Sequence, residues 1–336
     1  MQHSSHSHHI KIGTILALVS FFIFSSNDLL LKLITLDGGL MHNEKGANIL
    51  QVMLATSFFA LIPYTMIALF KWGPSAFKLQ RASIKLVVLR AFFSFFNSLV
   101  VIFSFKHLPM TQVYVMIFAT PLLVTILSIP FLGEKVGWRR WSATIIGFIG
   151  VVIAFRPSLA MFQDPIQLAP LSIAFFASMA IIVTKKALVI ERTVTIAIWN
   201  NIFLIMYLII PVFFVWQQMS MIQFTSCAIS GFIGGTAAYL FIEANRFMPA
   251  SQIAPFQYTQ FLWGVLIDWR IFKKAPDSLW VYVGAIIIIF SGTYTMFRNR
   301  RLRRIRFKPR SRRYLWSRQK SKFTQPQYGE VDAPNK

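Results

Sequence analysis

The residues with the greatest capacity for chemistry in this sequence are charged side chains inside long apolar runs. Asp28 and Lys32 are four residues apart, so a helix would place both on one face. Arg90 is a single cation within another apolar run. A charge among apolar helices is costly unless it is paired or faces a water-filled cavity. These three residues therefore indicate either structural ion pairs or an internal polar site.

Each of these charges has a structural and a functional interpretation. Asp28 and Lys32 either neutralise each other or form a charged patch on an internal cavity. Arg90 either extends to the membrane surface, pairs with a helix end or faces an anionic solute. Glu243 precedes Arg246 by three residues, which favours a local ion pair over a role in proton or cation coupling. The side-chain types alone leave these alternatives open.

Uncharged hydrogen-bonding side chains recur within the same apolar runs. Such residues either hold helices together or line a pocket for a polar solute. They are Asn97, Gln112, Tyr114, Gln257, Tyr258 and Gln260. The predicted solute-binding set is Asp28, Lys32, Arg90, Asn97, Gln112, Tyr114, Gln257 and Tyr258, with Glu243 as a candidate for coupling. We predict no catalytic and no metal-binding residues.

The composition is that of a polytopic membrane protein. Hydrophobic residues make up 56% of the 336 residues and charged residues only 13%, against about 25% charged residues in soluble domains. The apolar residues fall in blocks of about 20, the length that crosses a bilayer as a helix. A single cysteine, Cys227, excludes an intramolecular disulfide. We expect it to be a small buried side chain.

We predict an all-α polytopic membrane protein with ten transmembrane helices. The spans cover residues 10–34, 48–70, 84–105, 110–132, 138–155, 168–190, 194–216, 224–245, 250–271 and 278–297. An even number of spans places both termini on one side of the membrane. The loops of that side carry twelve Lys and Arg residues and the C-terminal tail fourteen more, against six on the other side. The positive-inside rule therefore predicts that both termini are cytoplasmic.

The sequence also contains an internal repeat. Residues 248–252, MPASQ, resemble residues 108–112, LPMTQ, at an offset of 140 residues. The predicted domain order is a disordered His-rich N-terminus at 1–10, a first five-helix repeat at 11–156, a second at 168–297 and a basic cytoplasmic tail at 298–336. Because each repeat has an odd number of spans, the two have opposite orientations. Such inverted repeats place a binding site between the halves, near the middle of the membrane.

An enzymatic function is not predicted. The sequence lacks HExxH, GxSxG, P-loop and Cys/His cluster motifs, and its short loops leave no room for a soluble catalytic domain. A membrane-embedded enzyme acting on lipid is disfavoured because His, Asp and Glu do not cluster near one interface. We expect no cofactor.

The net charge of +23 is concentrated in the C-terminal tail, which holds fourteen of the 34 basic residues. A basic segment beside a membrane span is typical of an anchor attracted to anionic lipid. We therefore expect membrane lipids rather than nucleic acid as the partner of this tail. A homodimer stays open.

Several sequence features match one family. They are Pro109, Pro121, Leu132-Gly133-Glu134 and Gly147-Phe148-Ile149-Gly150 in the first half, and Pro249, Ala254-Pro255, the segment 256–258, Ala275-Pro276-Asp277 and Gly284 in the second. With these residues the chain resembles EamA-type members of the drug/metabolite transporter superfamily. Ser26-Asn27-Asp28 followed by Lys32 also resembles several bacterial members of this superfamily, including carriers of S-adenosylmethionine. One departure is Phe272-Lys273-Lys274, where the family usually has an acidic residue after a glycine.

The resemblance implies a secondary transporter that works by alternating access. It implies a central cavity lined by spans one, three, four, six, eight and nine. The expected partner is a small polar solute such as an amino acid or S-adenosylmethionine, and the expected location is the bacterial inner membrane. The alternative hypothesis is a non-transporting membrane scaffold or regulatory protein that acts through its basic tail.

Overall fold

The computed structural model describes most of the chain up to residue 290. The described residues are 2–37, 45–108, 113–114, 117–155, 165–271, 279–280, 283–284, 286–287 and 290. Within these ranges the regular secondary structure is entirely helical. The chain divides into two units, Met1–Thr295 and Met296–Lys336, and every element below belongs to the first.

The helices follow most of the predicted spans to within a few residues, although the helix in the fourth predicted span, 110–132, begins at Thr120. They are α1 (Gln2–Thr35), α2 (Ile49–Trp72), η1 (Gly73–Phe77), α3 (Arg81–His107), α5 (Thr120–Leu132), α6 (Trp138–Phe155), α7 (Pro165–Ala187), α8 (Thr193–Phe214), α9 (Met221–Phe247), α10 (Ala250–Ile253), η3 (Ala254–Tyr258) and α11 (Thr259–Ile271). The bounds of α6 are those predicted from the sequence. Residues 2–10, predicted to be disordered, form the first turns of α1.

Six of these helices are long and apolar enough to cross a membrane, as judged on the described residues alone. The candidate spans are Lys11–Thr35, Ile49–Phe77, Arg81–His107, Leu168–Ala187, Thr193–Phe214 and Met221–Phe247. Two shorter apolar helices cover Thr120–Leu132 and Trp141–Gly150. The chain is therefore a multi-pass membrane protein. Most of the predicted tenth span, 278–297, lies outside the described residues.

Side chains and glycine set the ends of several helices. The Asn48 side chain accepts a hydrogen bond from the Leu50 amide at the start of α2. Ser220 and Gln223 form a reciprocal capping box at the start of α9. Gly133 ends α5 in the left-handed conformation, with φ of 64°, which glycine adopts without steric cost. The predicted break at Leu132-Gly133-Glu134 is thus a glycine-terminated helix end.

The predicted ninth span, 250–271, is a sequence of three helical segments rather than one continuous α-helix. The 3-10 segment η3 separates α10 from α11 and has proline at its start. Proline has no backbone N–H and so cannot close the α-helical hydrogen bond to the preceding turn. Gln257, which lines the cavity described below, lies in this 3-10 segment.

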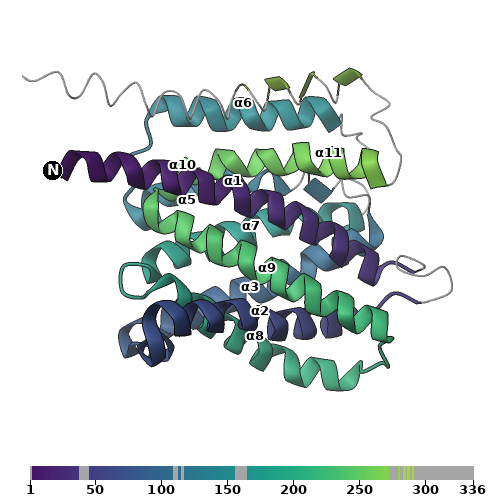
Figure 1. Ribbon diagram of the computed structural model, residues 1–336. Helices are drawn as coiled ribbons and strands as arrows, with labels where there is room; N and C mark the ends of the chain where they lie inside the picture. The colour runs from purple at the N-terminus through teal and green to yellow at the C-terminus, as the bar shows by residue number, and fades with distance from the viewer. Residues whose placement is uncertain are drawn as a thin grey trace, which may run out of the picture. The chain divides into compact units, whose positions relative to one another are not determined.

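The long helices lie alongside one another, with α1 packed against α9 and α3 against α7 (Figure 1). The helix α2 contacts both α8 and α9. A Cβ atom at Gly231 of α9 would lie 2.5 Å from the Thr56 carbonyl oxygen, and one at Gly235 would lie 2.9 Å from the Ala60 Cα. Glycine at both positions therefore allows α9 to approach the backbone of α2 closely.

The outer surface of the helices is strongly apolar. Phe70 is 88% exposed, Phe213 81% and Phe214 80%. A soluble protein rarely exposes so many large apolar side chains together, whereas lipid solvates them. Cys227, by contrast, is fully buried among Met53, Leu204 and neighbouring apolar residues. Its prediction as a small buried side chain is confirmed.

Charged side chains also hold helix ends in place. The Glu134 carboxylate accepts hydrogen bonds from the amides of Ala250 and Ser251, at 2.9 and 3.3 Å, at the start of α10. The Glu191 carboxylate accepts from the Gln80 amide at 2.8 Å, just before α3. Free amides at a helix N-terminus favour a negative charge. Each glutamate therefore fixes the start of a helix that is distant in sequence.

Candidate functional site

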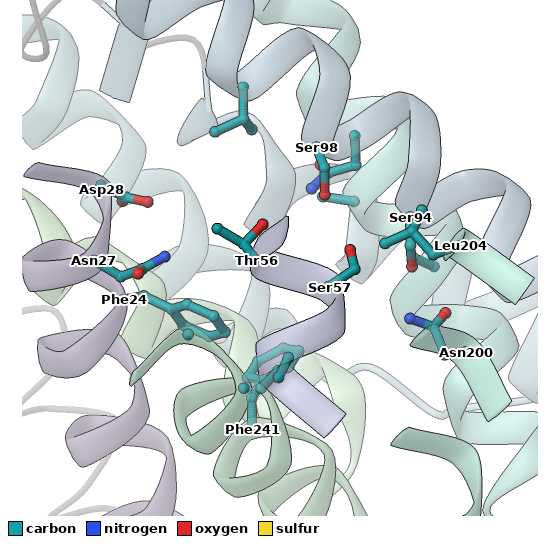
Figure 2. Close-up of a pocket in the computed structure, with 18 of the residues that line it drawn as sticks. Phe24, Asn27, Asp28, Thr56, Ser57, Ser94, Ser98, Asn200, Leu204 and Phe241 are labelled. Atoms are coloured by element: carbon teal, nitrogen blue, oxygen red, sulfur yellow. The ribbon is translucent and has the colours of Figure 1, made fainter. Parts of the chain in front are cut away.

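A cavity of about 360 Å³ lies between the helices of the first unit. Small-molecule sites in proteins typically enclose about 300–1,000 Å³, so this cavity has the size of a metabolite site. Figure 2 shows residues of α1 on one side of it and residues of α3 and α8 on the other. Its lining includes Asn27, Asp28, Thr56, Ser57, Tyr64, Arg90, Ser94, Asn97, Ser98, Thr120, Asn200, Asn201, Ser230, Gln257 and Gln260.

Helical spacing explains why one face of α3 reaches the cavity. Arg90, Ser94, Asn97 and Ser98 follow one another at intervals of four, three and one residues. Positions three and four apart share a helix face, so the four side chains form one polar stripe. The rest of α3 is largely apolar and includes Phe92, which is 44% exposed. The sequence of α3 therefore separates an outward apolar surface from an inward polar one.

Asp28 presents its carboxylate to the cavity from α1 (Figure 2). The Tyr114 hydroxyl donates a hydrogen bond to Asp28 Oδ2 at 2.9 Å, and Gln260 Nε2 donates to the same oxygen at 3.4 Å. Both donors are neutral. In the described part of the chain, Asp28 is thus held by hydrogen bonds from two other helical segments.

Asn27, next to Asp28, connects α1 to α9. Its Oδ1 accepts a hydrogen bond from the Ser230 hydroxyl at 2.8 Å. Gly234 lies beside it, where a Cβ atom would be 3.0 Å from Asn27 Nδ2. This contact fixes the rotation of α1 about its axis and therefore the direction of the Asp28 side chain.

Arg90 is buried in the interior, with only 9% of its surface exposed. Its Nε donates a hydrogen bond to Thr184 Oγ1 of α7 at 2.6 Å. Its Nη1 has no hydrogen-bond partner among the described residues. Tyr64 of α2 also lines the cavity. The guanidinium group thus points into the protein, and the interpretation in which Arg90 extends to the membrane surface is wrong.

Three further polar atoms that line the cavity have no partner within the described ranges. They are Asn97 Oδ1, Thr120 Oγ1 and Asn200 Oδ1. Buried polar atoms in folded proteins almost always have a hydrogen-bond partner, either protein or water. The cavity therefore offers unused hydrogen-bonding capacity, as expected of a site that binds a polar solute.

Comparison with known proteins agrees with this geometry. Residues 11–156 match the EamA-like transporter family. The chain is thus similar to members of the drug/metabolite transporter superfamily. The family resemblance predicted from the sequence is confirmed, and the matched residues are those of the predicted first repeat.

Several similar proteins align with most of the length of this chain. It is 26% identical to the S-adenosylmethionine uptake transporter of Rickettsia bellii over 290 residues, which cover 85% of this chain and 94% of that protein. It is 28% identical to a riboflavin transporter of Vibrio cholerae over 204 residues, covering 59% of this chain and 66% of that protein. A protein of known crystal structure aligns with a TM-score of 0.66 at 12% identity, over 85% of this chain and 97% of that one. The last likeness shows that the two share a fold.

The structure brings four of the predicted site residues together around the cavity. Asp28, Arg90, Asn97 and Gln257 all line it. Gln260, noted in the sequence as a hydrogen-bonding residue, lines it as well. Each of the spans predicted to line the cavity contributes residues to it, namely spans one, three, four, six, eight and nine.

Other predicted residues have different positions. Lys32 donates a hydrogen bond to the Leu108 carbonyl at 3.1 Å. Tyr114 and Tyr258 are each only 1% exposed and pack in one apolar cluster. The Tyr258 hydroxyl donates to the Thr144 carbonyl at 2.9 Å. Glu243 is not among the described residues that line the cavity, and Gln112 lies outside the described residues.

Sequence reasoning missed the contributions of α2 and α8. Thr56, Ser57 and Tyr64 come from α2, and Asn200 and Asn201 come from α8. Two adjacent asparagines in an otherwise apolar helix were a visible signal. In α2, the signal was the spacing of small polar residues, which is weak because serine and threonine also bond to their own helix backbone.

Proposed function

We propose that this chain is a secondary transporter that moves a small polar metabolite across the cytoplasmic membrane by alternating access. The observation that carries the proposal is the cavity of about 360 Å³, whose polar lining lies inside a shell of apolar helices. An amino acid or a solute resembling S-adenosylmethionine fits such a site. Relatives named as S-adenosylmethionine uptake transporters support this choice of solute.

The proposed architecture is ten transmembrane helices in two inverted five-helix repeats, residues 11–156 and 168–297. Its support is a correspondence between contacts in the two halves. The first helix of the first repeat, α1, packs on α9, the third helix of the second. Conversely, α3, the third of the first repeat, packs on α7, the first of the second. A two-fold axis in the membrane plane would exchange these two contacts.

The proposed solute contacts follow from the cavity. Asp28, Arg90, Asn97 and Gln257 would touch the solute directly. Tyr114 would act through Asp28, because it donates a hydrogen bond to that carboxylate. Lys32 and Tyr258 would support helix positions, since both donate to backbone carbonyls.

The following proposals rest on the sequence alone. We keep Gln112 as a proposed solute contact and Glu243 as the proposed coupling residue. Both termini are proposed to be cytoplasmic, in the inner membrane, and the tail at 298–336 is proposed to bind anionic lipid. The proposed transport function does not depend on whether the chain forms a homodimer.

The test is uptake of radiolabelled S-adenosylmethionine and amino acids into liposomes that contain the purified protein. We expect saturable uptake of at least one solute, and a strong reduction in Asp28→Asn with unchanged insertion in the membrane. Normal uptake by Asp28→Asn would remove Asp28 from the site. Absence of uptake for every solute would contradict the transporter proposal.

A truncation tests the alternative function. Removal of the residues after Arg298 should leave uptake intact, because the cavity is built from the helices before it. A scaffold or regulatory protein that acts through its tail would instead lose its partner on truncation. Retained uptake together with retained insertion would exclude that hypothesis.

A further inference from the structure

The charged lining of the cavity consists of two residues among those that the structure describes. Arg90 is its basic residue and Asp28 its acidic residue, and the other lining side chains are neutral. Figure 2 shows Asp28 on the α1 side and Ser94, one helical turn from Arg90, on the α3 side. The two charges thus come from different helices, α1 and α3.

Arg90 lacks a counter-ion in the described part of the chain. Its hydrogen bond there is to the neutral Thr184 hydroxyl. Its Nη1 is buried and has no partner. A buried charge without a partner strongly destabilises the folded state. An anion from outside the protein is the group that best completes such a site.

The single positive charge selects the kind of anion. Arginine binds planar carboxylates and also phosphates through its fixed N–H groups. A phosphate carries up to two negative charges at neutral pH, and this cavity has no second basic residue among its described lining to balance them. A carboxylate carries one negative charge, which Arg90 balances.

Asp28 on α1 determines which group is favoured at the other end of the solute. Asp28 receives hydrogen bonds from Tyr114 and Gln260, both neutral. A cationic group on the solute would therefore supply the charge that its described partners lack. Phe24 and Phe241 lie at the edge of the same cavity (Figure 2), and aromatic rings attract cations as well as apolar groups.

We propose that the transported solute is a zwitterion whose carboxylate binds Arg90 while its cationic group faces Asp28. This inference rests on the proposed transport function and narrows it. It excludes neutral solutes such as free flavins as the preferred cargo. Arg90 thereby becomes the specificity-determining residue for the acidic end of the solute.

The experiment compares solutes that differ only in the carboxylate. The probes are L-methionine with its methyl ester, and S-adenosylmethionine with its decarboxylated form. Binding to the purified protein is measured through the ligand-induced shift in thermal unfolding. For the wild type, we expect the carboxylate form of each pair to bind about tenfold more tightly or better, a difference of about 1.4 kcal/mol.

The variant Arg90→Gln should remove this preference, so that both members of each pair bind with similar affinity. Arg192→Gln is the matched control, because Arg192 lies against Trp72 and Ser75 outside the cavity. It should keep the wild-type preference. Loss of the preference in Arg90→Gln alone is a result that general destabilisation would not produce.

Two outcomes overturn the proposal. One is equal binding of both members of each pair by the wild type. This result would overturn the proposal even if Arg90→Gln does not fold, because it needs no variant. The other is a carboxylate preference that persists in Arg90→Gln. In either case, measurable uptake of a solute into liposomes would still uphold the transport function, so the two failures are distinguishable.

Discussion

The ammonium group of Lys32 donates a hydrogen bond to the carbonyl oxygen of Leu108, 3.1 Å away, where α3 ends. Lys185 makes the corresponding contact in the second half of the chain, donating to the carbonyl of Met248, where α9 ends. Leu108 and Met248 are 140 residues apart, the offset of the internal repeat. The helix ends that lead into both Pro109 and Pro249 are therefore each held by a lysine from another helix.

The first prediction concerns Lys185. It donates to the carbonyls of both Asn245 and Met248, and hydrogen bonds to charged groups contribute about 1.5–3 kcal/mol each. Lys185→Met should therefore lower the thermal unfolding midpoint clearly. Lys186→Met is the control, because the contact that Lys186 makes within the described ranges is with the ring of Phe131, and such a contact is worth about 0.5–1 kcal/mol. Equal effects of the two substitutions would contradict the assignment.

The second prediction concerns Glu134. Its carboxylate accepts hydrogen bonds from the Ala250 and Ser251 amides at the start of α10. Loss of such a cap typically costs about 0.5–2 kcal/mol, so Glu134→Ala should destabilise the protein by that amount. Hydrogen exchange should become faster at residues 250–253. The exposed neighbour Lys135 provides a control, and exchange in Lys135→Ala should match that of the wild type.

The third prediction concerns the close contact between α2 and α9. A Cβ atom at Gly231 would lie 2.5 Å from the Thr56 carbonyl oxygen and 2.7 Å from Phe59 Cβ. Gly231→Ala would therefore push the two helices apart, at a cost of about 1–3 kcal/mol. A Cβ at Gly137 would meet nothing within 4 Å, so Gly137→Ala should leave thermal stability unchanged. A fully stable Gly231→Ala would show that the helices are further apart than described.

The fourth prediction separates two buried tyrosines. Tyr114 donates to the Asp28 carboxylate in the cavity, whereas Tyr258 donates to the Thr144 backbone carbonyl. Replacement by phenylalanine removes only the hydroxyl, so packing in their shared cluster is preserved. Tyr114→Phe should therefore reduce uptake more than stability, and Tyr258→Phe the reverse. Uptake and unfolding assays on both variants measure this, and parallel losses in the two would refute the distinction.

The sequence was sufficient to locate most of the long helices and part of the cavity lining. Apolar runs of membrane-spanning length predicted α2, α3, α8 and α9 to within a few residues, because lipid demands long apolar helices. Gly133 marked the end of α5 because glycine readily adopts positive φ. Asp28 and Arg90 were predicted as site residues because charges are rare inside such runs, and both line the cavity.

The remaining features depend on contacts between helices that are distant in sequence. Spacing placed Asp28 and Lys32 on one helix face, yet Asp28 bonds to Tyr114 and Lys32 bonds to Leu108. Periodicity shows which residues share a face and does not identify the neighbouring helix. For the same reason, the asparagines of α8 could be seen in the sequence, but their place beside α3 could not.

The complete burial of Cys227 has a practical consequence for measuring motion. Cys227 is the single cysteine in the chain and is fully buried, so a thiol reagent should react with it slowly. Cysteines introduced at exposed positions should therefore be labelled selectively, even with Cys227 present. Val189 and Trp216 are 86% and 66% exposed and lie beyond opposite ends of α8. Spin labels there, or paired with further exposed sites, would report distances during solute exchange without a cysteine-free background first being engineered.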